Sequence, residues 1–106
     1  MFRFFQRTKR TQERKISGPF TVSPAGRISL TSEGAVFLHV ETGTIFRSNR
    51  IGARIWQGVL DGRNHDAIAD DISREYGAPR EQVAQDTAQF LTELESAGFL
   101  ARNGSR

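Results

Sequence analysis

Apolar residues change their spacing along the chain at about residue 49. Before this point they lie in short extended runs, of which Ala35–Val40 is the strongest because it is rich in β-branched and aromatic residues. Arg27–Leu30 and Thr44–Ser48 flank this run, and the connections between the runs are of hairpin length and contain glycine. The pattern predicts a three-stranded antiparallel meander.

After residue 49 the apolar residues recur with the period of a helix. Asn49 and Asn64 are suited to cap two successive helices, and Pro79 is suited to the first position of a third. Three glycines end the apolar stripes: Gly62, Gly77 and Gly98. Strands followed by helices predict an α+β fold, winged helix-turn-helix-like, with the three-stranded meander placed before the three helices.

The length of 106 residues supports one domain. We expect a basic, flexible N-terminal tail over residues 1–25, the folded domain over 26–101 and a frayed C-terminus over 102–106. The net charge is +3, but residues 1–15 carry six basic and one acidic residue, and the remainder carries nine basic and eleven acidic residues. The basic character therefore belongs to the tail. We expect the tail to be solvated, with contact to an anionic membrane through its phenylalanines left open.

The sequence lacks the residues of the common catalytic and metal sites. It has no cysteine, no phosphate-binding glycine motif and no histidine pair at helical spacing, and no apolar stretch reaches the roughly 18 residues of a membrane span. Four carboxylates on the second predicted helix are expected to be solvated: Asp66, Asp70, Asp71 and Glu75. We therefore expect no catalytic residue, no metal site and no cofactor, and a protein that is not an enzyme. The lack of cysteine is compatible with the cytoplasm, where we expect the chain to act.

Three segments in the helical half occur together in an order that is characteristic of one family. They are I-W-Q-G-V-L-D-G at Ile55–Gly62, I-A-D-D-I-S-R-E-Y-G at Ile68–Gly77, and D-T-A-Q-F-L at Asp86–Leu91 followed by G-F-L. In this order and spacing the chain resembles the PqqD-like family, the small peptide chaperones also called RiPP recognition elements, over residues of about 26–101. Ser48 departs from the family, which usually has leucine before the helix-opening asparagine.

The resemblance implies that the chain recognises the leader of a ribosomally synthesised precursor peptide and presents it to a modifying enzyme, often of the radical S-adenosylmethionine type. In the family the leader adds as a strand beside the third strand, against the third helix. Carried over to this sequence, the peptide-binding residues are Thr44, Ile45, Phe46, Arg47, Val83, Asp86, Thr87 and Phe90. Phe46 and Phe90 are also expected to contribute to the core. Thr87 is expected at the groove wall, where Thr87→Arg would block binding with little unfolding.

Two other functions stay open at this stage. The chain could be a docking subunit of a biosynthetic complex that binds no free peptide. It could also be a winged-helix nucleic-acid binder, although the last helix has the wrong charge for contact with phosphates. That helix sets one basic residue against four acidic residues: Arg80 against Glu81, Asp86, Glu93 and Glu95.

Overall fold

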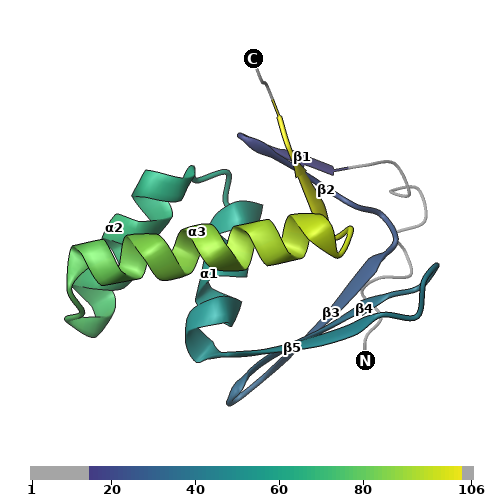
Figure 1. Ribbon diagram of the computed structural model, residues 1–106, viewed down its shortest axis with the longest axis horizontal. Coiled ribbons are helices and arrows are strands. Elements are labelled where there is room, and N and C mark those ends of the chain that lie inside the picture. The colour runs from purple at the N-terminus through teal and green to yellow at the C-terminus, as the bar shows by residue number, and fades with distance from the viewer. Residues whose placement is uncertain (1–14, 104–106) are drawn as a thin grey trace.

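The computed structural model describes residues 15–103. It contains, in chain order, β1 (Lys15–Ser17), β2 (Phe20–Val22), β3 (Gly26–Thr31), β4 (Gly34–His39), β5 (Ile45–Asn49), α1 (Arg50–Leu60), α2 (His65–Tyr76), α3 (Arg80–Ser96) and β6 (Leu100–Arg102) (Figure 1). The predicted α+β class is confirmed: a meander of three strands precedes three helices. Within the described residues, no helix is both long and apolar enough to cross a membrane.

The predicted meander is the sheet β3-β4-β5, in which both strand pairs are antiparallel. Phe37 at the middle of β4 pairs with Ile28 on β3 and with Phe46 on β5. These three side chains point to the same face because directly opposed residues of a sheet share a face. Phe37 is fully buried, so this face of the meander covers the core.

The predicted helix boundaries are confirmed to within a residue or two. The Asn49 side chain accepts a hydrogen bond of 3.0 Å from the Gly52 N–H, which caps α1. The Asn64 side chain accepts one of 2.9 Å from the Ala67 N–H, which caps α2. Pro79 has an extended backbone and is the N-cap of α3, so the helix begins one residue later than we predicted.

A second small sheet, β1-β2-β6, was not predicted. Val22 pairs with Lys15 on one side and with Leu100 on the other, so this sheet joins the beginning and the end of the described chain. Residues 15–22 therefore contain two paired strands, where we had expected tail up to residue 25, and Arg102 is paired where we had expected fraying. Strands of three residues are too short to show the alternation of apolar and polar residues that marks a strand. β6 also follows β2 by about 80 residues, so no hairpin turn in the sequence indicates that the two strands pair. The tail expectation for residues 1–14 lies outside the described part.

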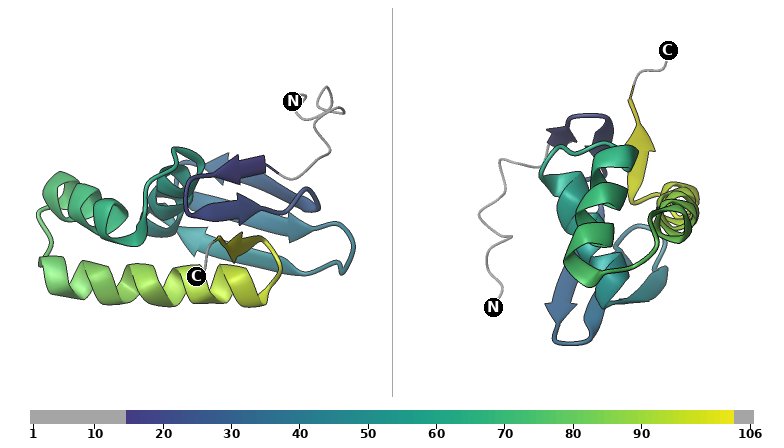
Figure 2. Two further views of the ribbon diagram at one scale, coloured as in Figure 1. Left: turned by 90° about the horizontal axis from the view of Figure 1, so that it is seen from above. Right: turned by 90° about the vertical axis from the view of Figure 1, so that its left-hand side faces the viewer.

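The core lies between the meander and the helices and is centred on Phe37. The Phe37 ring contacts Trp56 of α1 edge-on, with ring centroids 5.3 Å apart, and it contacts Phe99 with ring centroids 5.5 Å apart. Trp56 is 3% exposed, which confirms it as a core residue. Figure 2 shows α3 running along the long axis of the molecule, with β6 returning from its C-terminal end. The meander and α3 thus lie beside each other around the aromatic cluster.

Candidate functional site

Strand β5 is an edge of its sheet, because its only strand neighbour among the described residues is β4. The His39 N–H donates to the Thr44 carbonyl at 2.9 Å, which makes these two residues a hydrogen-bonded pair. Such pairs alternate along antiparallel strands with pairs that make no mutual hydrogen bond. The next hydrogen-bonded pair is therefore Phe37 with Phe46, and the pairs Leu38 with Ile45 and Val36 with Arg47 are of the other kind.

The backbone groups of Ile45 and Arg47 consequently point away from β4. Each of these residues presents one N–H and one carbonyl on the outer side of β5, which is what an added strand requires. Their side chains lie on the outer face of the sheet, where Ile45 is 62% exposed. Phe46 lies on the opposite face, because successive side chains of a strand alternate, and it is half-buried on the core side.

Helix α3 forms the other wall of the site. Phe90 on α3 stacks on Phe46 of β5, with ring centroids 5.7 Å apart and planes inclined by 24°. An open hollow of about 200 Å³ lies next to this pair, between α3 and the N-terminal half of α1. Its lining residues are Asn49, Gly52, Ile55, Asp86, Gln89, Phe90 and Glu93. Asn49 is the last residue of β5, so the hollow adjoins the free strand edge.

Six of the eight residues predicted for the site lie at the edge strand or line the hollow. Four lie on or directly before the edge strand: Thr44, Ile45, Phe46 and Arg47. Asp86 and Phe90 line the hollow. Val83 and Thr87 are not among its lining residues, and they are buried, at 5% and 0% exposed. They belong to the stripe of α3 that continues through Leu91 and faces the core.

The expectation for Thr87 is therefore wrong. Positions 83, 87 and 91 follow one another at four-residue spacing, and the hollow is lined by the neighbouring stripe at 86, 89, 90 and 93. An arginine at position 87 would put a charge into the core and would unfold the protein rather than block a groove. Five of the seven lining residues were not predicted from the sequence: Asn49, Gly52, Ile55, Gln89 and Glu93. Glu93 follows Asp86 by seven residues, and this spacing indicates that the two residues share a face of α3.

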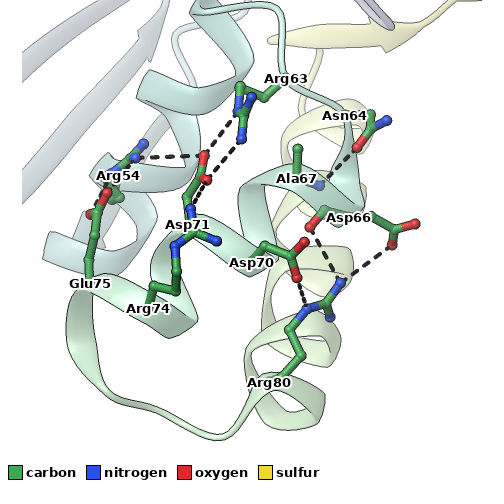
Figure 3. A network of polar contacts seen from close by, with 10 residues as sticks. All are labelled: Arg54, Arg63, Asn64, Asp66, Ala67, Asp70, Asp71, Arg74, Glu75 and Arg80. Atoms are coloured by element: carbon green, nitrogen blue, oxygen red, sulfur yellow. Dashed lines mark hydrogen bonds and ion pairs between the residues drawn. The ribbon is translucent and has the colours of Figure 1, made fainter.

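The carboxylates of α2 are held by arginines (Figure 3). Asp71 accepts two hydrogen bonds of 2.9 Å from Arg63, and its Oδ1 also accepts one from Arg74. Asp71 is 9% exposed, so the expectation that it is solvated is wrong: its side chain turns toward the loop between α1 and α2. The hydrogen bonds from Arg63 lower the pKa of Asp71, against the opposing effect of desolvation.

The other carboxylates of α2 lie at the surface. Glu75 accepts hydrogen bonds of 2.9 and 2.8 Å from Arg54, and these hydrogen bonds lower its pKa. Arg80 of α3 forms ion pairs with Asp70 and Asp66 (Figure 3). This network connects α1, α2 and α3, and no two of its carboxylates share an apolar pocket of the kind that separates the pKa values of an acid and a base. The geometry therefore indicates a structural role.

Among the described residues, no three metal-ligating side chains come together. His39 of β4 is 7% exposed, with its ring centroid 5.7 Å from that of Phe99. His65 opens α2, and its Nε2 lies 3.0 Å from the Ala84 carbonyl. The histidines thus have separate places in the fold.

Residues 34–100 match the family described as coenzyme PQQ synthesis protein D, PqqD. The chain belongs to the PqqD family. The match begins at β4 and ends at the first residue of β6, so the PqqD part contains β5, α3 and the hollow between α3 and α1. The hairpin of β1 and β2 lies outside the match.

Two solved structures share this PqqD fold. One is TbiB1 in complex with the TbiA(beta) leader peptide, at 32% identity and a TM-score of 0.69, covering 80% of this chain and 96% of that one. The other is lasso peptide synthetase B1 complexed with the leader peptide, at 27% identity and a TM-score of 0.71, covering 79% and 99%. None of the curated proteins compared with the chain matches it. Both PqqD-like structures were solved with a leader peptide.

Proposed function

We propose that this PqqD-family protein binds the leader of a ribosomally synthesised precursor peptide as an added strand on β5. The observation that carries the proposal is the free edge of β5 beside the hollow under α3. The outward N–H and carbonyl groups of Ile45 and Arg47 supply the hydrogen bonds of a fourth strand. Side chains of that strand alternate between the two faces of the sheet, so every second one points toward α3.

Two further observations support the proposal. The two similar structures, TbiB1 and lasso peptide synthetase B1, are complexes with leader peptides. Within the described residues, the carboxylates of α2 are also paired with arginines rather than with each other, so they do not form an acid–base pair. The proposal includes that the protein is a binding partner rather than a catalyst, and that it acts in the cytoplasm. It presents the peptide to a modifying enzyme, for which the radical S-adenosylmethionine type is a candidate.

The experiment is a titration of ¹⁵N-labelled protein with the leader half of a candidate precursor, taken from any short open reading frame that a search finds beside its gene. We expect amide shifts at Ile45 and Arg47 and on the face of α3 from Asp86 to Glu93. Shifts confined to α2 would contradict the proposal.

Strand addition can be tested directly by placing proline at a position of β5 whose backbone N–H points away from β4. Arg47→Pro removes one outward donor and leaves the hydrogen bonds between β4 and β5 in place, because proline is tolerated at such positions of an edge strand. Leu30→Pro is the matched control, since Leu30 is 63% exposed and its N–H points outward from β3, the opposite edge of the same sheet. We expect Arg47→Pro to weaken binding by at least about tenfold, the effect of about 1.4 kcal/mol, and Leu30→Pro to leave it unchanged. Equal effects of the two would argue against an added strand on β5.

A further inference from the structure

The hollow beside β5 combines an apolar floor with an acidic rim. Ile55 is 1% exposed and forms the floor with Phe90 and Gly52. Gly52 contributes no side chain, and a Cβ there would lie 3.0 Å from the Phe90 ring. The rim holds the amides of Asn49 and Gln89 and, on the side of α3, the carboxylates of Asp86 and Glu93. Such a hollow can hold a side chain that is apolar along its length and polar at its tip.

Within residues 15–103, no basic side chain pairs with the carboxylates of the rim. Asp86 and Glu93 lie two helical turns apart on one face of α3, about 10.5 Å along its axis. Each interacts within the described chain only with a glutamine amide four residues earlier, at 3.4–3.5 Å. In the part of the chain that the structure describes, no arginine, lysine or histidine lines the hollow. By contrast, ion pairs with arginines are formed by Asp66, Asp70, Asp71, Glu75 and Glu95.

Resting on the proposed function, we infer that the hollow receives a lysine or arginine side chain of the bound peptide. Its methylene stem lies along Phe90 and Ile55, and its cation pairs with Asp86 or Glu93. Lysine and arginine cover apolar surface with their stems while their charged ends stay in contact with water, which suits an open hollow of this composition. A glutamate side chain would meet two like charges, and an aliphatic side chain would leave both carboxylates unpaired. The bound peptide is thus of the class that carries a basic residue at one fixed position of its added strand.

The test is a selection from a displayed library of random 12-residue peptides. It is run in parallel on the wild type, on the variant Asp86→Asn/Glu93→Gln and on the control Glu81→Gln/Glu41→Gln. Both variants remove two exposed carboxylates, but Glu81 and Glu41 lie outside the hollow. Selected peptides are then made with the enriched residue as lysine or as norleucine, and their affinities are measured at low and high salt.

We expect lysine or arginine to be enriched at one peptide position on the wild type and on the control, and the enrichment to disappear on Asp86→Asn/Glu93→Gln. We also expect the lysine peptide to bind the wild type about three to ten times more tightly than the norleucine peptide at low salt, with the difference reduced by salt. Two outcomes would overturn the inference and leave the proposed function standing, provided that the selected peptides shift the amides of β5. In the first, the peptides show no preference for a basic residue. In the second, they show this preference equally on the wild type and on Asp86→Asn/Glu93→Gln. Failure to select any peptide that shifts the amides of β5 would overturn both.

Discussion

Phe46 on the edge strand and Phe90 on the last helix stack on each other, with ring centroids 5.7 Å apart. Both rings also pack against Phe37, at 5.7 and 6.1 Å. The free edge of β5 is thereby fixed relative to α3 by the same aromatic cluster that forms the core. The width of the candidate groove is set by packing and does not depend on a loop.

Phe90 belongs both to the candidate groove and to the core, so we expect a substitution there to change peptide binding and stability together. Phe90→Ala removes the stack on Phe46 and a contact with Phe37, so we expect the free energy of unfolding to fall by about 2–3 kcal/mol, somewhat less than for a fully buried phenylalanine. Peptide binding should weaken as well. Denaturant unfolding measures the first effect, and a change below about 0.5 kcal/mol would show that the stack does not support the fold.

At Thr87 we expect a substitution that raises the free energy of unfolding, in contrast to Phe90→Ala. Its side chain is fully buried, and its hydroxyl has no hydrogen-bond partner among the described residues. Thr87→Val keeps the shape and removes the unpaired polar group, so we expect a gain of about 1 kcal/mol. Thr92→Val, at an exposed position of the same helix, is the control and should change stability by less than about 0.5 kcal/mol. A loss of stability in Thr87→Val would mean that the hydroxyl is satisfied in solution.

Gly34 constrains where β5 lies against β4. Its φ is +156°, and a Cβ there would lie 1.9 Å from the Ser48 carbonyl oxygen. Gly34→Ala must therefore push the end of β5 away from β4, and we expect a loss of at least about 2 kcal/mol. Gly43→Ala is the control, because Gly43 also has a positive φ but has nothing within 4 Å of the added Cβ. It should cost only the backbone strain of about 1 kcal/mol. Equal losses in the two variants would contradict the clash with Ser48.

The arginine pairs of α2 predict a loss of stability in acid. Folding lowers the pKa values of Asp71 and Glu75 below their ordinary values near 4. A group with a lowered pKa in the folded state contributes stability above its unfolded pKa, and this contribution is lost as the pH falls through the folded pKa. At neutral pH we expect Asp71→Asn to lower Tm by at least about 4 °C. The difference from the wild type should shrink toward about pH 3 in melts followed by circular dichroism, and a difference independent of pH would show that the charge of Asp71 contributes nothing.

Local patterns in the sequence predicted the parts of the fold that local interactions determine. The side chains of Asn49 and Asn64 cap the helices that they were expected to begin. The faces of α3 were harder to assign, because the stripe through Thr87 and the stripe through Asp86 are adjacent, and only packing shows which one faces the core.

Parts of the fold that depend on distant segments could not be predicted. Nothing near Val22 indicates that it pairs with Leu100, and nothing near Asp71 indicates that Arg63 turns back toward it. The hollow combines residues of β5, α1 and α3, so its acidic rim above an apolar floor appears only once these elements are packed.

The small sheet β1-β2-β6 has a consequence for how this domain can be built into larger proteins. Lys15 and Leu100 flank Val22 on neighbouring strands, so they are separated by about two strand spacings, roughly 10 Å. Strands β1 and β6 are both antiparallel to β2, so the described chain enters this sheet beside Val22 and leaves it at the opposite end, beside Phe20. This sheet is separate from the sheet that contains β5, so segments that continue from either end leave away from the free edge of β5.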